Sequence, residues 1–183
     1  MTARILVAYA TRYGSTQEVA EAIGARLRGQ GLDVEVKPAR DVRQLDGFAA
    51  VVLGTPLYIG SALKGWAAFV ERHHAVLEQL PVAVFALGPI SASDDMADAR
   101  GQLDAALAKT PWLAPVAIEL FVGKYDPAKL HLADKLIAVI PASPLHGVGL
   151  HDERDWDAID AWADKLPEAL SVESRASAAT TAT

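Results

Sequence analysis

The stretch YATRYGSTQEVAEAI, residues 9–23, places a turn of small and hydroxylated residues between a hydrophobic run and a helical pattern. The run that leads into it, ARILVAYA (3–10), is continuous and rich in aliphatic residues, which predicts a buried β-strand. The turn contains no lysine, and its small or hydroxylated residues are Thr11, Gly14, Ser15 and Thr16. Because a helix start exposes unpaired N–H groups, such a turn is a candidate site for an anion.

Strand-like and helix-like patterns alternate outward from this stretch. Apolar runs predict five strands, at residues 3–10, 32–39, 48–56, 81–89 and 115–123. Helical spacing predicts helices at residues 16–31, 62–80, 94–110 and 154–170. Repeated strand–helix units favour a parallel sheet covered by helices on both faces. Ligands bind such sheets at the carboxyl ends of the strands, here the turns after Tyr9, Gly54, Gly88 and Val122.

The helical spacing also predicts which faces are buried. The first helix should bury one aliphatic face, formed by Val19, Ala20, Ile23 and Leu27. The helix at 62–80 should bury Leu63, Trp66, Phe69, Val70 and Leu77. The last helix should bury Trp156, Ile159, Trp162 and Leu166. We therefore expect Trp66, Trp156 and Trp162 in the core.

Composition and charge limit the class of protein. The 183 residues are 51% hydrophobic, include no cysteine and have a formal net charge of −6. These values favour one globular domain without disulfides and disfavour a nucleic-acid partner. No apolar run is long enough to span a bilayer, and the chain enters a strand without a leader pattern, so we expect a cytoplasmic protein. Residues 171–183, rich in Ala, Ser and Thr, predict a disordered tail.

The residues of the turn by themselves leave two interpretations open. Helix N–H groups and the hydroxyls of Thr11, Ser15 and Thr16 would hold a terminal phosphate with neutral donors. An ordinary helix start would instead use Ser15 or Thr16 as its N-cap. Neither G-x-G-x-x-G nor G-x-x-x-x-G-K-[ST] is present in the turn, and the chain has no G-x-S-x-G elbow. The strand ends also lack the acidic residues of a phospho-receiver domain.

The stretch VAYATRYGSTQEVAEAI (7–23) resembles the phosphate-loop signature of the flavodoxins, with Ala8 where a bulkier apolar residue is usual. Residues 51–70 resemble the second flavin-contacting loop and its helix. Residues 121–166 resemble a narrower group, the flavodoxin-domain proteins related to menaquinone-dependent protoporphyrinogen IX dehydrogenases. The resemblance implies a doubly wound, five-stranded parallel sheet of order 2-1-3-4-5 that binds FMN. It implies one domain at 1–170, with a helical insertion at 124–150 after the fifth strand.

The resemblance implies three FMN-binding loops. The loop around the phosphate consists of Thr11, Arg12, Tyr13, Gly14, Ser15 and Thr16. The loop at the edge of the isoalloxazine ring consists of Thr55, Pro56, Leu57, Tyr58, Ile59 and Gly60. The loop facing the other side of the ring, or the ribityl chain, consists of Gly88, Pro89, Ile90 and Ser91. Because the flavin carries the redox chemistry, no catalytic side chain and no metal is expected.

Two features depart from electron-carrier flavodoxins. Carriers often sandwich the ring between two aromatic side chains, whereas the second loop here offers only Tyr58 and the third offers none. We expect one open face of the flavin and a less depressed reduction potential. The insertion carries an apolar helical face, formed by Leu130, Ala133, Leu136, Ile137 and Ile140. Packing on the domain, or on a second subunit in a homodimer, is favoured over contact with a quinone or a peripheral membrane surface.

These features favour an FMN-dependent oxidoreductase that passes electrons between an organic substrate and a quinone-like acceptor. Protoporphyrinogen IX dehydrogenation is the specific activity that the resemblance implies. The alternative is a flavodoxin-type electron carrier for a protein partner, and a third hypothesis is a domain that acts only through dimerisation. The intact phosphate loop argues against the third. Arg12 and Arg154 would either form local ion pairs or meet an anionic substrate near the flavin.

Overall fold

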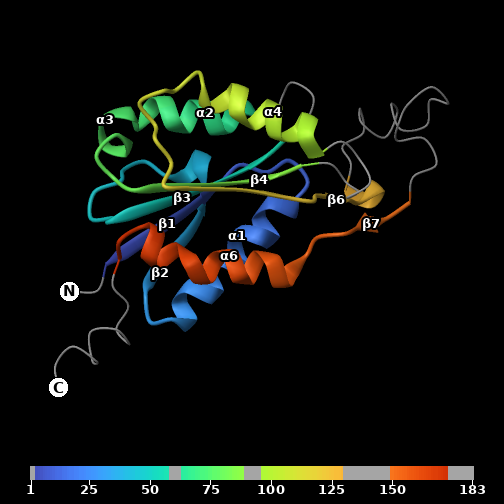
Figure 1. Ribbon diagram of the computed structural model, residues 1–183, viewed down its shortest axis with the longest axis horizontal. Helices are drawn as coiled ribbons and strands as arrows, with labels where there is room; N and C mark the ends of the chain where they lie inside the picture. The colour runs from blue at the N-terminus through green and yellow to red at the C-terminus, as the bar shows by residue number, and fades with distance from the viewer. Residues whose placement is uncertain (1–2, 58–62, 89–95, 130–148, 173–183) are drawn as a thin grey trace.

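The computed structural model describes residues 3–57, 63–88, 96–129 and 149–172, and its centre is one five-stranded parallel sheet (Figure 1). The strands are β1 (Arg4–Tyr9), β2 (Asp33–Pro38), β3 (Ala50–Pro56), β4 (Val82–Leu87) and β5 (Ala117–Phe121). Their spatial order is β2-β1-β3-β4-β5, with every neighbouring pair parallel. The predicted fold class and strand order are therefore confirmed.

Helices cover both faces of the sheet (Figure 1). One layer contains α1 (Ser15–Gly29) and α6 (Trp156–Ala169). The other contains α2 (Leu63–Arg72), α3 (His74–Leu77) and α4 (Met96–Leu107). Short 3-10 turns occur at η1 (Ala39–Asp41) and η2 (Pro127–Lys129). None of the helices in the described ranges has the length and apolar character needed to cross a bilayer.

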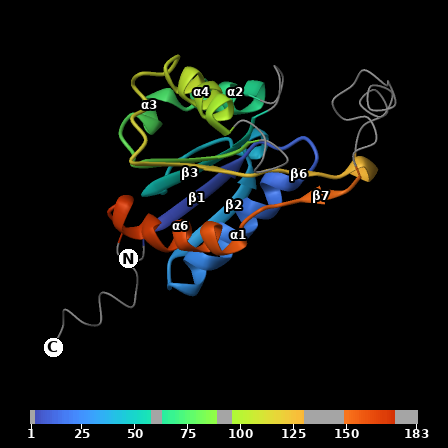
Figure 2. The same cartoon turned by 45° about the vertical axis from the view of Figure 1, so that its right-hand side comes forward.

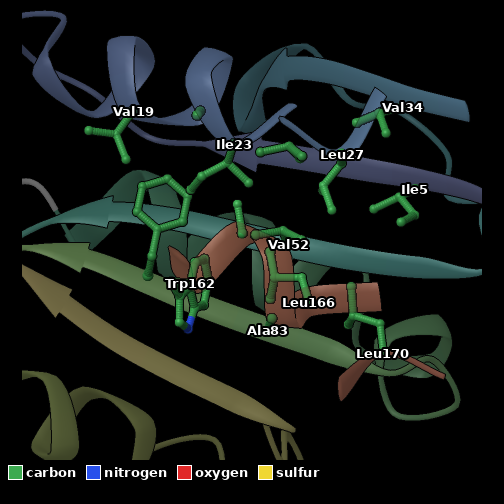
Figure 3. Packing of buried hydrophobic residues seen from close by; sticks show 14 of the residues in the cluster. Ile5, Val19, Ile23, Leu27, Val34, Val52, Ala83, Trp162, Leu166 and Leu170 are labelled. Atoms are coloured by element: carbon green, nitrogen blue, oxygen red, sulfur yellow. The ribbon is translucent and has the colours of Figure 1, made fainter. Parts of the chain in front are cut away.

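Each helix layer forms its own hydrophobic core with one face of the sheet. Alternate residues of β1 separate the two cores, because successive strand side chains point to opposite faces. Ile5 and Val7 pack in the α1/α6 core, and Leu6 and Ala8 pack in the core beneath α2 and α4. Figure 3 shows the α1/α6 core, in which the predicted apolar face of α1, and that of α6 except for Trp156, are buried: Val19, Ala20, Ile23, Leu27, Ile159, Trp162 and Leu166.

The predicted helix at 62–80 is divided in two at His73. His73 has φ −106° and ψ 15°, which ends α2, and α3 begins at the next residue. The imidazole is buried, its Nε2 lies 3.4 Å from the carbonyl oxygen of Val42, and its ring centroid lies 4.7 Å from that of Phe69. Tertiary contacts of one side chain therefore coincide with a break that the apolar spacing did not predict.

The prediction that Trp156 lies in the core is wrong. Its residue is 42% exposed, whereas Trp66 and Trp162 are buried as expected. Trp156 is the first residue of α6, where its ring covers the guanidinium of Arg154 with a centroid distance of 4.6 Å. The side chain thus covers an arginine just before the N-terminus of α6. Ile159 and Trp162 of the same predicted helix face pack in the core.

The first residues of the predicted insertion and the residues that follow it form a small sheet of their own. β6 (Lys124–Tyr125) pairs antiparallel with β7 (His151–Asp152), so the two ends of the segment lie side by side (Figure 2). Two-residue strands are too short to show a period, so the sequence did not predict them. Residues 130–148, with the predicted apolar helical face, lie outside the described residues. At the other boundary, Val172 is still buried in the α1/α6 core, and residues 173–183 are not described.

Candidate functional site

The carboxyl ends of β1, β3 and β4 meet at one edge of the sheet. Their register pairs Tyr9 with Gly54, and Pro56 with Leu87. Backbone hydrogen bonds continue past the strand ends, from Ala10 N to the Gly54 carbonyl oxygen at 2.9 Å. The chain leaves β1 toward β2 on one side, and β3 lies on the other, so this edge is the point where strand order reverses. Doubly wound sheets bind their ligands at such a point.

The turn after β1, Thr11–Thr16, leads into α1 through a residue in the left-handed conformation. We call it the phosphate turn after its predicted ligand. Gly14 is the N-cap of α1 with φ 92°, a conformation that suits glycine because it has no Cβ. The Gly14 N–H donates to Thr11 Oγ1 at 2.9 Å, and Glu18 N donates to the Gly14 carbonyl oxygen at 3.0 Å. The interpretation of Ser15 or Thr16 as an ordinary N-cap is therefore wrong. The first N–H groups of α1 remain directed at the turn, as an anion site requires.

Thr16 provides the test of whether this turn fits a phosphate. Its side chain is fully buried, yet its Oγ1 has no hydrogen-bond partner among the described residues. A buried hydroxyl without a partner costs roughly 1–3 kcal/mol. A phosphate oxygen held by the N–H groups of the same helix turn would accept that hydroxyl proton. The residues of the turn therefore fit a bound phosphate group.

The outer part of the turn is more open. Arg12 is exposed, and its guanidinium carbon lies 5.3 Å from the centroid of the Tyr13 ring. Ser15 is buried beside Thr16. The turn thus presents hydroxyls and N–H groups inward and its arginine outward.

The other two predicted loops begin at the same edge, and only their first residues are described. Thr55 and Pro56 end β3, where Thr55 is fully buried, and Leu57 follows them, also buried. Leu57 N donates to the Leu87 carbonyl oxygen at 2.8 Å, and Gly88 N donates to that of Phe121 at 2.8 Å. The fold therefore brings the starts of the three predicted loops together. The remaining predicted residues, Tyr58, Ile59, Gly60, Pro89, Ile90 and Ser91, lie outside the described residues.

A cluster of charges stands beside the phosphate turn, and sequence reasoning missed it. We call it the Glu18 cluster: Glu18, Lys124, Lys129, Asp152 and Arg154. Glu18, in the first turn of α1, accepts from the nitrogens of Arg154 at 2.7 Å, Lys129 at 3.1 Å and Lys124 at 3.3 Å. Arg154 also makes two hydrogen bonds to Asp152, at 2.7 and 2.8 Å. The members come from three distant parts of the chain, so no local motif could have revealed them.

The charge cluster determines the protonation of its carboxylates. Burial by itself would raise the pKa of Glu18, but hydrogen bonds from Arg154, Lys129 and Lys124 outweigh it and lower that pKa to about 2. Hydrogen bonds from Arg154 lower the pKa of Asp152, against the opposing effect of burial. Both carboxylates are therefore ionised at neutral pH. The side chain of Arg154 is 2% exposed, so its role is this local ion pairing rather than contact with a substrate in solution.

Two further features of the described residues lie away from this edge. A shallow groove of about 650 Å³ runs between α1 and α6, where Arg26 and Asp164 form a bidentate ion pair at 2.7 Å. It borders the C-terminal half of α1, at the other end of the helix from the phosphate turn.

The neighbouring histidines at the junction of α2 and α3 contact different partners. His73 lies near the Val42 carbonyl, and the His74 ring is stacked on Trp112 with 3.7 Å between centroids. Within the described ranges, no three His, Asp or Glu side chains are grouped as metal ligands.

Comparison with known proteins agrees with this geometry. Over 90 residues the chain is 23% identical to protoporphyrinogen IX dehydrogenase [quinone] of Escherichia coli, which covers 48% of this chain and 50% of that protein. The match thus spans about half of the curated relative. Among solved structures, a Streptococcus pneumoniae flavodoxin superposes with TM-score 0.56 at 18% identity, covering 91% of this chain and 99% of that one. An archaeal flavodoxin superposes with TM-score 0.53 at 17% identity, covering 92% and 99%.

The structural matches establish the shared fold, and the family comes from the sequence. The family model of the flavodoxin domain matches residues 6–142, about three-quarters of the chain. That range includes the phosphate turn, β1 from Leu6 onward, the other four strands of the main sheet and the start of the segment after β5. The chain therefore belongs to the flavodoxin domain family, whose cofactor is FMN.

Proposed function

We propose that the turn at Thr11–Thr16 holds the phosphate of FMN and that the loops after β3 and β4 flank its ring. The observation that carries this proposal is the Thr16 hydroxyl, which is fully buried in the first turn of α1 without a partner among the described residues. The turn also lies at the edge of the sheet where the strand order reverses, which supports the same conclusion. The ring-side contacts would involve Thr55–Gly60 and Gly88–Ser91.

When bound, FMN supplies the electron-transfer chemistry, and the chain supplies binding and orientation. Thr11 holds the backbone of the turn by accepting from Gly14 N. Thr16 and the first N–H groups of α1 donate to the phosphate oxygens. The hydrogen bonds that join Leu57 to Leu87 and Gly88 to Phe121 hold the starts of the other two loops at the same edge. The rigid sheet therefore sets the position of the ring relative to the phosphate.

The reaction that we propose is electron transfer between a reduced organic substrate and a quinone-like acceptor. The similarity to a protoporphyrinogen IX dehydrogenase [quinone] supports this reaction class and suggests protoporphyrinogen IX as the specific substrate. The single aromatic residue in the two ring-side loops, Tyr58, supports it independently, because an open ring face admits a small molecule. A homodimer or a membrane-surface contact through the insertion, and a cytoplasmic location, belong to the same proposal.

The first experiment is the visible spectrum of the purified protein with and without added FMN, followed by stepwise reduction. The proposal expects the absorption bands of bound flavin, and reduction in a single two-electron step. Turnover with protoporphyrinogen IX and a quinone would then identify the substrate. Reduction in two well-separated one-electron steps would instead favour the flavodoxin-type carrier for a protein partner. Absence of flavin binding would contradict the whole proposal.

A further inference from the structure

We propose that Lys129 contacts the FMN phosphate and is the cation that makes this turn select phosphorylated flavins. The proposal rests on the proposed function and adds to it a residue from a distant part of the chain. The phosphate turn itself contains no lysine, and its arginine, Arg12, is exposed, so the donors that line its inner side are hydroxyls and backbone N–H groups. The charged partner comes instead from η2, after β5.

The position of Lys129 is the first support. Its Nζ lies 3.8 Å from the point that a Cβ on Gly14 would occupy. Gly14 is the N-cap residue around which the phosphate turn is built. The backbone of η2 is held by Asp126, whose side chain accepts from Ala128 N at 3.0 Å and whose carbonyl oxygen accepts from Lys129 N at 3.1 Å. These hydrogen bonds fix the backbone of η2, which places the Lys129 side chain beside the phosphate turn.

The second support is the charge balance of the Glu18 cluster. It contains the three cations of Lys124, Lys129 and Arg154 and the two carboxylates of Glu18 and Asp152, which leaves one positive charge in excess. Without these cations, the Glu18 carboxylate would repel a phosphate at the same helix start. The cluster therefore converts an unfavourable charge beside the turn into a net attraction for an anion.

Differences in exposure identify which cation faces the ligand. The side chain of Arg154 is 2% exposed and that of Lys124 is 17% exposed, and each is within ion-pair distance of both carboxylates. The side chain of Lys129 is 46% exposed, and its ammonium group has three donors, one of which reaches Glu18 at 3.1 Å. Lys129 can thus donate to a phosphate oxygen while it keeps its bond to Glu18.

The buried hydroxyl of Thr16 provides an independent indication of a ligand at this place. It lies in the first turn of α1, two residues from Gly14, and lacks a partner among the described residues. A phosphate at the helix start would accept a hydrogen bond from the Thr16 hydroxyl on the inner side of the turn and another from the Lys129 ammonium group on its outer side. The two groups differ in one testable respect, because only the lysine contributes a charge.

The test compares FMN with riboflavin, which has the same ring and no phosphate. Dissociation constants of both are measured by quenching of flavin fluorescence for the flavin-free wild type, Lys129→Met, Lys129→Arg and the control Lys165→Met, an exposed lysine on α6. We expect Lys129→Met to weaken FMN binding about tenfold, as for a charge-assisted hydrogen bond, and to leave riboflavin binding within about twofold. Lys129→Arg and Lys165→Met should bind FMN nearly as the wild type does.

Salt provides the second readout. Raising the salt concentration from about 50 to about 500 mM should weaken FMN binding to the wild type more than to Lys129→Met, since salt screens exposed charges. Equal FMN binding by wild type and Lys129→Met would overturn the inference. So would a Lys129→Met protein that loses FMN and riboflavin to the same degree, because that result indicates a structural role. A wild type that binds neither flavin would overturn the proposed function itself, and the inference with it.

Discussion

At the scale of single residues, Thr16 is the position where binding and stability oppose one another. The hydroxyl is buried and unpaired among the described residues, so it destabilises the flavin-free protein. The whole side chain, including its methyl group, is buried at the start of α1. Valine keeps that shape and omits the hydroxyl, which makes the two effects separable.

We expect Thr16→Val to raise the free energy of unfolding of the flavin-free protein by about 1 kcal/mol and to weaken FMN binding by about five- to tenfold. Urea unfolding and fluorescence titration measure the two effects. Thr110→Val is the matched control, because Thr110 Oγ1 donates to the Leu107 carbonyl oxygen at 3.2 Å and its loss should lower stability. A Thr16→Val protein that is less stable than the wild type would show that the hydroxyl has a partner in the folded chain.

Glu18 makes the stability of the protein depend on pH in acid. Its pKa is about 2 in the folded chain against an ordinary value of 4.5, because the hydrogen bonds from Arg154, Lys129 and Lys124 outweigh the opposing effect of burial. A lowered folded-state pKa stabilises the protein fully above about pH 4.5, and this stabilisation is lost as the pH falls from about 4.5 to about 2. Urea unfolding across this range should show the loss. In Glu18→Gln the dependence should be shallower, while Glu71→Gln, an exposed carboxylate on α2, serves as the control.

At the scale of elements, two glycines leave room for side chains of neighbouring elements. A Cβ on Gly54 in β3 would overlap the ring of Phe85 in β4, and a Cβ on Gly24 in α1 would overlap Val36 in β2. Neither residue needs a positive φ, so it is space rather than backbone conformation that requires glycine there. The Phe85 ring fills the place beside Gly54 within the α1/α6 core, where it also meets Trp162 edge-on at 6.1 Å between centroids.

We expect Gly54→Ala to destabilise the fold by about 2 kcal/mol, because the added methyl group forces the buried Phe85 ring to move. Gly101→Ala provides the opposite case, since Gly101 lies in α4 with open space at its Cβ position. Alanine there should stabilise the helix by about 0.5–1 kcal/mol. Thermal unfolding of both variants measures the contrast. If the two alanines had equal effects, the close packing of β3 on β4 would not govern this position.

At the scale of the whole molecule, Arg154 joins the segment after β5 to the start of α1, the helix that follows the turn at Thr11–Thr16. Its guanidinium bonds Asp152 in β7 and Glu18 in α1, and it lies 3.4 Å from the Ser15 carbonyl oxygen in the phosphate turn. Lys124 in β6 contributes to the same cluster. The antiparallel pair β6–β7, seen in Figure 2, is therefore held to the start of α1 by the ion pairs of Lys124 and Arg154 with Glu18.

We expect Arg154→Met to lower the free energy of unfolding by about 1–3 kcal/mol, less than for a fully buried pair because both carboxylates are partly exposed. The loss should shrink near pH 2, where the carboxylates become protonated. Arg40→Met, which removes an exposed arginine, is the matched control, and chemical unfolding at pH 7 and near pH 2 measures both. A loss of stability that stayed constant across this range would point to packing on Trp156 rather than to the ion pairs.

Local patterns were sufficient where one stretch of chain determines its own structure. Aliphatic runs predicted the five strands of the main sheet, and the spacing of Val19, Ile23 and Leu27 predicted the buried face of α1. Local spacing failed at His73, where the Val42 carbonyl lies near the imidazole at a helix break, and at Trp156, where a buried arginine draws the ring away from the core. At His73 the partner is distant in sequence, and at Trp156 the ring covers an arginine two residues away that is itself held by the distant Glu18.

The sequence by itself determined the parallel sheet, the order of its strands through the family resemblance, and the turn at Thr11–Thr16 between the first strand and the first helix. The strands and helices follow from residue spacing within single stretches, because strand and helix periods are local properties, whereas the strand order was implied only by the resemblance. Only the tertiary structure decided that Gly14 is the N-cap, that Thr16 is buried without a partner, and that Lys129 and Arg154 converge on Glu18. Burial and charge pairing depend on which distant residues the fold brings into contact, and no local pattern contains that information.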